Sequence, residues 1–160
     1  MQLSTPGNVV PPPRGIHETK VDEKGRLKLT AIFQKYLEAF GQRDVFCTSL
    51  DNVIARVYPI PTWMENEKIF AQRGENATKL GHVQFQAAKM GADSVMDDAG
   101  RVLLPQKLRQ PLKLEGATVY LQVEKGAISV YSEEAIAKRD AEVQANLTED
   151  LAVGEAAGIR

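Results

Sequence analysis

The stretch Val21-Asp22-Glu23-Lys24-Gly25-Arg26-Leu27-Lys28-Leu29 recurs in kind further along the chain as Met96-Asp97-Asp98-Ala99-Gly100-Arg101-Val102-Leu103-Leu104. Both stretches carry the motif Asp-x-x-Gly-Arg between apolar residues. The glycine of such a motif suits the positive φ of a tight turn, where a side chain would clash. The aspartate carboxylate accepts hydrogen bonds from backbone N–H groups two or three residues further on. Each stretch therefore predicts a tight turn between two strands, held by the structural residues Asp22, Gly25, Asp97 and Gly100.

The segments that follow the two motifs also match in kind. A short amphipathic stretch comes first, at 31–40 and at 105–114, and a glycine closes each one. A pair of apolar runs typical of a hairpin follows, and then a helix-like segment at 62–72 and at 132–146. A half with about five short elements buries too little apolar surface to be stable alone, whereas two halves complete one another's sheet. We therefore expect an α+β fold with an internal duplication, namely one pseudo-symmetric β-barrel with peripheral helices.

The composition is that of an ordinary globular protein, with 43% hydrophobic and 26% charged residues among 160. No apolar run approaches the roughly 20 residues that a membrane helix needs, so we expect no membrane partner. The N-terminus is polar and Pro-rich and lacks the apolar core of a secretory signal, which favours a cytoplasmic protein. A single cysteine, Cys47, forms no internal disulfide, and the two histidines, His17 and His82, are too far apart in the sequence to predict a metal cluster. We expect no metal, no cofactor and no small-molecule substrate.

Charge is distributed unevenly along a chain whose net charge is −1. Residues 14–36 carry a net charge of +3 and residues 132–160 one of −4, which favours an anionic partner at the basic end. The two turns differ in the same way. The candidate contacts to an anionic partner are the basic residues that flank the first turn, namely Lys20, Lys24, Arg26 and Lys28.

The second turn has a different charge pattern. Three acidic residues lie within or just before it, and Arg101 is the one cation beside them. Because each phosphate that a protein neutralises releases counterions and so stabilises the complex, we expect the first turn to face DNA. The second turn, with Arg101, is expected to serve as scaffold or as a subunit contact.

Further motifs follow the order of a known family. Arg14-Gly15 precedes the first motif, Val57-Tyr58-Pro59 and Trp63 follow the first hairpin, and Leu108-Arg109 and Val130-Tyr131-Ser132 follow the second motif. From about Arg14 to Arg139 the chain resembles the MraZ family of bacterial transcriptional regulators.

The resemblance implies a swapped-hairpin, AbrB-like fold that is duplicated within the chain. It also implies ring-shaped homo-oligomers, a nucleoid-associated location, and binding of double-stranded DNA at short direct repeats in the promoter of a division and cell-wall gene cluster. The basic residues that approach DNA in the family match Lys24 and Arg26 here, and Arg14 matches a further basic position near the start. This sequence has Thr30 where the family usually has proline, and Lys35 only loosely represents a basic residue of the following helix; both differences bear on the operator rather than on the fold.

The expected organisation of the chain follows from the repeat and the resemblance. It comprises an N-terminal extension at 1–13, a first repeat at 14–72, a linker with a helix at 73–95, a second repeat at 96–146 and an acidic tail at 147–160. In the DNA-binding interpretation, Arg26 makes a bidentate contact to guanine, while Lys24 and Lys28 bind phosphates.

Two other interpretations are weighed against a DNA-binding regulator. Paired aspartates in pseudo-symmetric halves are typical of an aspartic-protease dyad, in which two carboxylates share a proton. Here an arginine follows each aspartate by four residues and would hold it ionised, and the sequence Asp-Thr-Gly or Asp-Ser-Gly is missing, so we expect no enzyme. The second alternative is an assembly module that forms a ring without binding DNA, which the net negative charge and Thr30 slightly favour. Retention on heparin or promoter DNA that falls with salt distinguishes a regulator from such a module.

Overall fold

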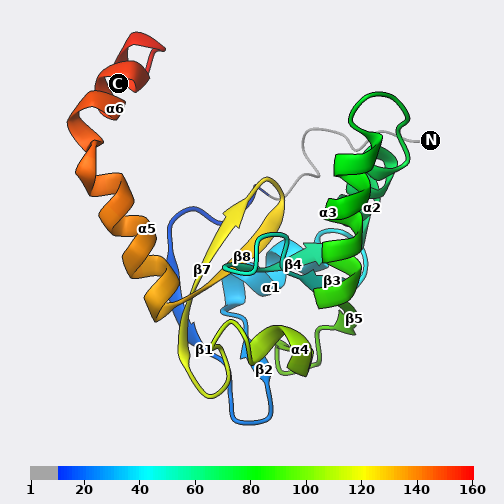
Figure 1. The fold of residues 1–160 in the computed structure, drawn as a ribbon. Coiled ribbons are helices and arrows are strands. Elements are labelled where there is room, and N and C mark those ends of the chain that lie inside the picture. Colours follow the sequence, from blue (N-terminus) through cyan, green and yellow to red (C-terminus); the bar gives the residue numbers. More distant parts are fainter. Residues whose placement is uncertain (1–10) are drawn as a thin grey trace.

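The computed structural model describes residues 11–160, so most of the expected extension, 1–13, lies outside the described residues. Within this range the chain forms eight strands and six helices. In chain order they are β1 (His17–Lys20), β2 (Arg26–Lys28), α1 (Ala31–Glu38), β3 (Asp44–Thr48), β4 (Ala55–Pro59), α2 (Ile60–Phe70), α3 (Ala77–Met90), β5 (Ala92–Val95), β6 (Arg101–Leu103), α4 (Gln106–Arg109), β7 (Thr118–Glu124), β8 (Ala127–Ser132), α5 (Glu133–Ala145) and α6 (Leu147–Ala156). The fold is mixed α+β with antiparallel strands (Figure 1).

The strands form two hydrogen-bonded sheets that are joined in a closed order. Six strands form a sheet in the order β1-β7-β8-β4-β3-β5, and β2 and β6 form a separate two-stranded ribbon. Two isolated bridges connect the sheet to the ribbon. Val21, just after β1, bridges Leu27 in β2, and Met96, just after β5, bridges Val102 in β6. The path through the eight strands therefore returns to its start.

The two halves of the chain exchange strands along this path. β1 of the first half pairs with β7 of the second, and β5 of the second half pairs with β3 of the first. The N–H of Leu29 donates to the carbonyl of Gly100, and the N–H of Leu104 donates to that of Gly25, both at 2.9 Å. Strands of either half therefore obtain their backbone partners from the other half.

One hydrophobic core lies inside this arrangement and takes side chains from both halves. Leu27 and Val102, at the centre of the ribbon, are completely buried, and Phe33 of α1 and Leu108 of α4 belong to the same cluster. A buried side chain of this size contributes about 1.5–3 kcal/mol relative to an exposed one. The two halves share this core, so each depends on the other for its stability.

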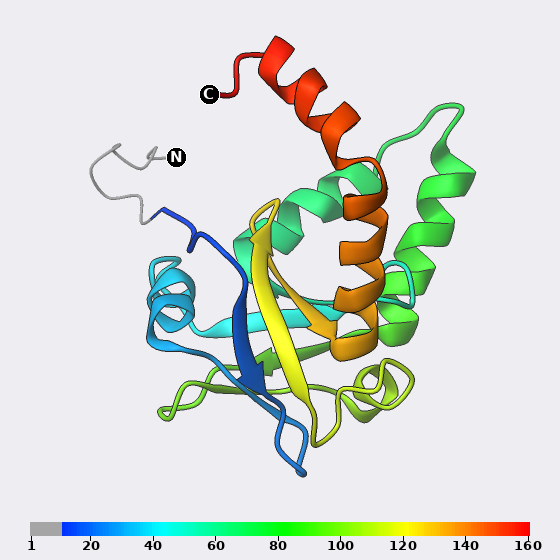
Figure 2. The same cartoon turned by 90° about the vertical axis from the view of Figure 1, so that its left-hand side faces the viewer.

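The helices lie around the strands. α2 and α3 lie side by side and pack on β3, over a second apolar cluster that contains Tyr58, Trp63 and Ala87. α5 packs on β7 and β8, and α6 continues from it away from the body of the molecule (Figure 2). No residue of α6 is buried. Among the helices of residues 11–160, none has the length and apolar character of a membrane span.

Two elements lie in segments that the sequence did not predict to contain them. β5 (Ala92–Val95) falls within the expected linker 73–95, so the strand that leads into the second motif begins before residue 96. It precedes the second motif as β1 precedes the first, as the repeat requires, but of its four residues, Ala-Asp-Ser-Val, valine alone favours a strand. The acidic segment 147–160 contains α6.

Candidate nucleic-acid interface

Asp22 organises the turn between β1 and β2, called the first turn here (residues 22–25). Its Oδ1 accepts the backbone N–H groups of Lys24 and Arg26, both at 2.9 Å, and its Oδ2 accepts the Nε of Arg26 at 2.7 Å. The backbone N–H of Arg26 is the largest of the interactions that hold the pKa of the Asp22 carboxyl below its ordinary value, and the side chain of Arg26 adds to the effect. Asp22 is thus held in the ionised form that accepts all three hydrogen bonds.

The turn between β5 and β6, called the second turn (residues 97–100), is built in the same way. Asp97 Oδ1 accepts the N–H groups of Ala99 and Arg101 at 2.9 Å, and Oδ2 accepts the Nε of Arg101 at 3.0 Å. The backbone N–H of Arg101 is the first cause of the lowered pKa of Asp97. Gly25 and Gly100 have φ values of +87° and +77°, a region that favours glycine. In backbone and ion pair the two turns are therefore equivalent.

The two carboxylates lie at opposite ends of the ribbon. β2 and β6 are antiparallel, and each turn directly precedes one of these strands. Asp22 and Asp97 each bind their own arginine and have lowered pKa values, whereas a pair of carboxylates that share a proton has one strongly raised pKa. The geometry is therefore not that of an aspartic dyad.

A side chain of the second half completes the first turn. A Cβ added to Gly25 would lie 2.5 Å from the guanidinium of Arg109, which therefore packs directly on this glycine. The Nε of Arg109 donates to Glu115 at 3.2 Å, and a terminal N–H donates to the carbonyl of Leu104. The Arg109 side chain is 14% exposed and paired with Glu115, so its guanidinium is held in a fixed position beneath the turn.

At the second turn, Gln34 of α1 occupies the position that Arg109 occupies at the first turn. It packs against Gly100, and its Nε2 donates to the carbonyl of Leu29 at 2.8 Å. Sequence reasoning assigned no role to Arg109. The repeat could have indicated that Gln34 and Arg109 are equivalent, because they are as far apart in the sequence as the two motifs are. The equivalent position is thus neutral at the second turn and cationic at the first.

The structure brings three of the five predicted DNA contacts to the first turn. Lys24 is exposed in the turn, Arg26 is partly exposed beside it, and Lys20 is exposed at the end of β1 that leads into it. The other two lie elsewhere. Lys28 is at the far end of the ribbon, where its Nζ donates to a carbonyl of the second turn. Arg14 precedes β1, so the whole of this strand separates it from the first turn.

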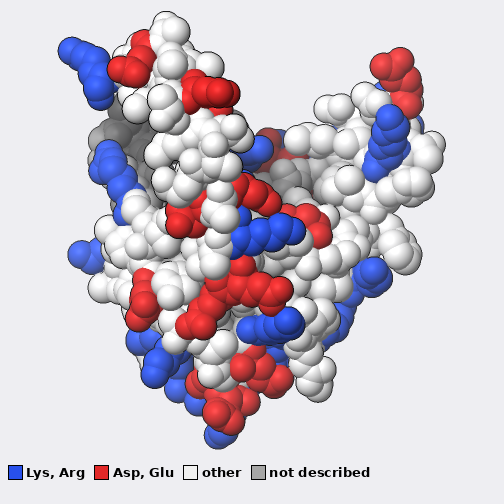
Figure 3. Space-filling model, turned by 60° about the vertical axis from the view of Figure 1, so that its left-hand side comes forward, with Lys and Arg blue, Asp and Glu red and all other residues white. Residues whose placement is uncertain are grey.

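The acidic residues of the second turn are paired with cations. Asp98 forms an ion pair with Arg43 at 2.8 Å, and Asp97 forms the pair with Arg101. On the face shown in Figure 3, acidic and basic side chains alternate over the lower part of the molecule, so the charge difference between the turns is local. Lys24 and Arg109 of the first turn stand where the second turn has Ala99 and Gln34. Lys20 likewise matches Val95, whereas Lys28 lies at the second turn.

No family model matches the chain, but known proteins are similar to it over about two thirds of its length or more. A protein of Acidobacterium capsulatum named transcriptional regulator MraZ is 40% identical over 110 residues, which are 66% of this chain and 73% of that protein. A protein of the same name from Koribacter versatilis is 34% identical over 105 residues, which are 64% and 71% of the two chains. A third, from Desulforamulus reducens, is 31% identical over 133 residues, which are 82% of this chain and 89% of the relative.

These relatives define the class of the protein, because all three bear the name of a transcriptional regulator. The likeness covers two thirds or more of each relative, and in the match to the Desulforamulus reducens protein it extends over 82% of this chain. The chain belongs to the MraZ family of transcriptional regulators.

Proposed function

We propose that this chain regulates transcription by binding double-stranded DNA sequence-specifically at its first turn. In this proposal the fold is a swapped-hairpin, AbrB-like fold duplicated within one chain, and several copies form a ring-shaped homo-oligomer in the cytoplasm, associated with the nucleoid. The targets are short direct repeats in the promoter of a division and cell-wall gene cluster. Membership of the MraZ family supports this proposal, and the exchange of strands between the two halves supports its statement on the fold.

The observation that carries DNA binding is the contrast between two turns of the same construction. Both have the same hydrogen bonds to aspartate, the same ion pair and a glycine of positive φ. The first turn adds Lys24 and Arg109, whereas the second has uncharged residues at both places. Arg109 also holds the turn in place through Glu115 and the carbonyl of Leu104, whereas Lys24 is exposed in the turn. Cations in an exposed turn are what binding to a phosphate backbone requires.

The geometry of the first turn suits a division of labour between bases and phosphates. Asp22 holds the Nε of Arg26, which fixes the guanidinium plane and leaves its terminal amino groups for the O6 and N7 of a guanine. Lys20 and Lys24 bind phosphates next to that base, and Arg14 and Lys28, which lie away from the turn, bind phosphates that flank it. One turn makes few contacts, so useful affinity comes from several copies that engage successive repeats.

The first test concerns the phosphate contact of Lys24. The probe is duplex DNA from the region upstream of this chain's own coding sequence, and binding is measured by fluorescence anisotropy over a range of salt concentrations. For Lys24→Ala we expect the slope of log K against log salt to decrease in magnitude by about 0.9 per turn engaged. Lys68→Ala is the matched control, because it removes the same charge from α2, where Lys68 pairs with Glu65. A slope that Lys24→Ala leaves unchanged contradicts the proposal, and a parent protein that does not bind at any salt favours the assembly module.

The second arm of this test separates base recognition from the structure of the turn. Arg26→Lys and Arg101→Lys keep the charge but remove the planar guanidinium, whose Nε binds the aspartate and whose fixed fork suits a bidentate contact. We expect similar small losses of stability in both variants, and a loss of about 1–3 kcal/mol in DNA affinity per site in Arg26→Lys alone. Equal affinities of the two variants for the repeats would show that Arg26 does not read a base.

A further inference from the structure

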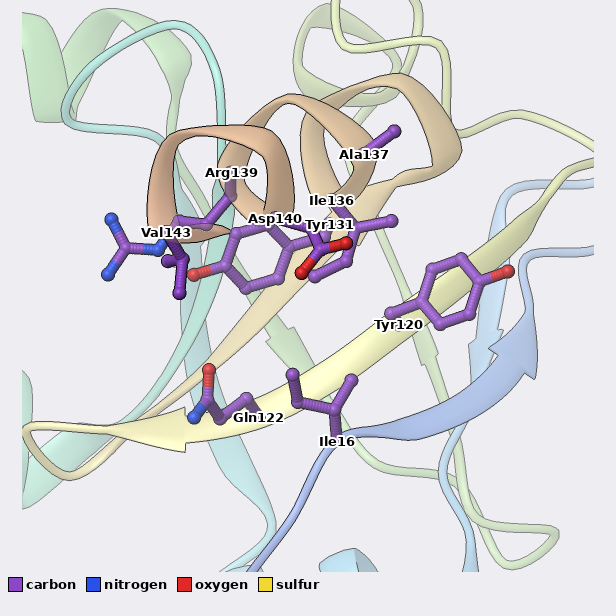
Figure 4. A pocket seen from close by; sticks show the side chains of 9 residues that line it. All are labelled: Ile16, Tyr120, Gln122, Tyr131, Ile136, Ala137, Arg139, Asp140 and Val143. Atoms are coloured by element: carbon purple, nitrogen blue, oxygen red, sulfur yellow. The ribbon is translucent and has the colours of Figure 1, made fainter. Parts of the chain in front are cut away.

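A groove runs between α5 and the strands β7 and β8, with a volume of about 560 Å³. Figure 4 shows Ile16 and Gln122 pointing toward α5, while Ile136, Asp140 and Val143 project from that helix. Ile16 and Val143 are exposed apolar residues. The groove, called the second groove here, therefore opens an apolar surface to solvent at the base of the α5–α6 arm.

The first half of the chain has an equivalent groove beside α2, called the first groove. Phe46 on β3 lies opposite Tyr58 of the next strand, and Tyr120 on β7 lies opposite Tyr131 in the same way. Most of the helix residues that line the two grooves follow these tyrosines at the same intervals. The matching residues are Trp63, Met64, Glu67 and Phe70 in the first groove, and Ile136, Ala137, Asp140 and Val143 in the second; Ile60 and Arg139 line their grooves without a counterpart. The two grooves thus correspond through the internal duplication.

A partner helix distinguishes the two grooves. α3 packs beside α2, and its residues Gln84 and Ala88 line the first groove. The lining of the second groove comes from β7, β8, α5 and Ile16, and no further helix of residues 11–160 contributes to it. The position beside α5 in the second half is therefore equivalent to the position beside α2 that α3 occupies in the first half. No helix of the described residues occupies it.

The outer face of α3 has the features of a helix that binds such a groove. His82, Phe85 and Lys89 are spaced by three and four residues, so they lie on the same face of the helix. Phe85 is 70% exposed, an aromatic ring presented to solvent in the middle of this face. Aromatic residues that enter a pocket at the centre of an interface contribute much of its binding energy.

The charges of the two surfaces are complementary. α3 (Ala77–Met90) contains two lysines and no acidic residue, whereas residues 133–156, which form the arm, contain seven acidic and two basic residues. Leu147 and Leu151 continue the exposed apolar surface along the arm. Opposite charges around apolar contacts accelerate association and fix the orientation of the partners.

We propose that the second groove and the α5–α6 arm bind the outer face of α3 in a second copy of the chain. Phe85 of one copy enters the second groove of the next, beside Ile16 and Val143, and Lys89 faces the acidic arm. The contact joins different surfaces of two identical chains, so copies add head to tail and form a ring when the rotation closes. This inference rests on the homo-oligomer of the proposed function and identifies the surfaces that build it.

The test uses one variant for each surface and sedimentation velocity of the full chain over a range of concentrations. Phe85→Ser changes the helix face and Val143→Asp changes the groove; we expect each to raise the dissociation constant of self-association at least tenfold, on the order of the loss of one central interface contact. Val53→Ser, an exposed apolar residue in the β3–β4 loop, is the control and leaves assembly unchanged. Leu151→Ser, in a helix with no buried residue, replaces Val143→Asp if circular dichroism shows that the latter is unfolded.

Mixing the two variants makes the test specific for a head-to-tail contact. Phe85→Ser keeps an intact groove and Val143→Asp keeps an intact α3 face, so an equimolar mixture is expected to form a species with twice the mass of one chain and nothing larger. A parent that stays monomeric, a variant that assembles like the parent, or a mixture that stays monomeric overturns the proposal. Binding of the parent protein to a short duplex with a single repeat is measured in parallel. A parent protein that assembles but does not bind this duplex contradicts the proposed DNA recognition and still supports the proposed interface.

Discussion

Gly25 and Gly100 show how single residues connect the two halves of the chain. Each has a positive φ, and each has a side chain from a helix of the other half stacked where its Cβ would lie, namely Arg109 on Gly25 and Gln34 on Gly100. Arg109 comes from the half opposite to the glycine that it covers. The sequence motif predicts the glycines, because positive φ is a local requirement of the turn. It does not predict the residues that cover them, because these depend on how α1 and α4 pack.

Gly100→Ala is expected to destabilise the protein more than Gly41→Ala. Both glycines have a φ close to +80°, where alanine costs about 1–2 kcal/mol. At Gly41 an added Cβ meets nothing within 4 Å, whereas at Gly100 it would lie 2.2 Å from Gln34 Nε2 and displace the hydrogen bond from Gln34 to Leu29. Loss of that bond adds about 1 kcal/mol. Urea unfolding of both variants measures the difference, and equal losses would show that Gln34 moves aside without cost.

At the scale of elements, α1 and α4 begin in equivalent ways at Thr30 and Pro105, which occupy matching positions after the two motifs. Thr30 has φ −71° and ψ 163°, and Pro105 has φ −64° and ψ 145°, so the backbone at Thr30 already has a conformation that proline adopts. The buried hydroxyl oxygen of Thr30 has no hydrogen-bond partner within the described chain. The Thr30 side chain therefore does not cap the N-terminus of α1.

Thr30→Pro is expected to stabilise the protein. Proline restricts the unfolded chain at a position whose native φ it can adopt, which raises the free energy of unfolding by about 0.4–1 kcal/mol. For a chain of this size the melting temperature should rise by about 1–4 °C. Thr30→Ala is the control that removes the unpaired hydroxyl without restricting φ, and its effect should be smaller. A melting temperature of Thr30→Pro below that of the parent would mean that the residue before it, Leu29, cannot adopt the extended backbone that proline requires.

The elements themselves were largely predictable, and their pairing was not. The helix-like segments 31–40, 62–72 and 132–146 contain or overlap α1, α2 and α5, because helical periodicity is visible within a short window of sequence. The exchange of β1 and β5 between halves depends on contacts between distant residues, which leave no local pattern. The same limit explains Lys28: its sequence position suggested the first turn, but the extended strand carries it to the second.

At the scale of the whole molecule, the two turn aspartates link stability to pH. Both have a folded-state pKa below the ordinary value of 3.8, so the stability that they contribute is fully present above that value. It is lost as the pH falls through their lowered pKa values, because the unfolded chain then binds protons more readily than the folded one. Acid therefore weakens both turns together, and with them both junctions between the sheet and the ribbon.

The double variant Asp22→Asn, Asp97→Asn is expected to be less stable than the parent at neutral pH and to lose part of the parent's sensitivity to acid. The difference in urea midpoint between the two proteins should therefore shrink as the pH falls below the ordinary carboxyl value of 3.8. A difference between parent and double variant that stays constant with pH would show that the two carboxylates have ordinary pKa values in the folded protein.

The pairing of β2 with β6 also has a consequence for the order of events during synthesis. These strands join residues that are distant in the sequence, such as Arg26 and Leu103, and the glycine of the first turn is covered by a residue that is made later still. At a translation rate of about 5–20 residues per second, the first turn is synthesised about 4–15 s before its partner strand. During that interval the nascent first half holds its unpaired strands open, and a second nascent chain of the same kind on a neighbouring ribosome offers the same complementary strands as the chain's own second half. Slower translation between α2 and β6 should therefore increase the fraction of chains whose β2 pairs with β6 of another chain rather than with their own.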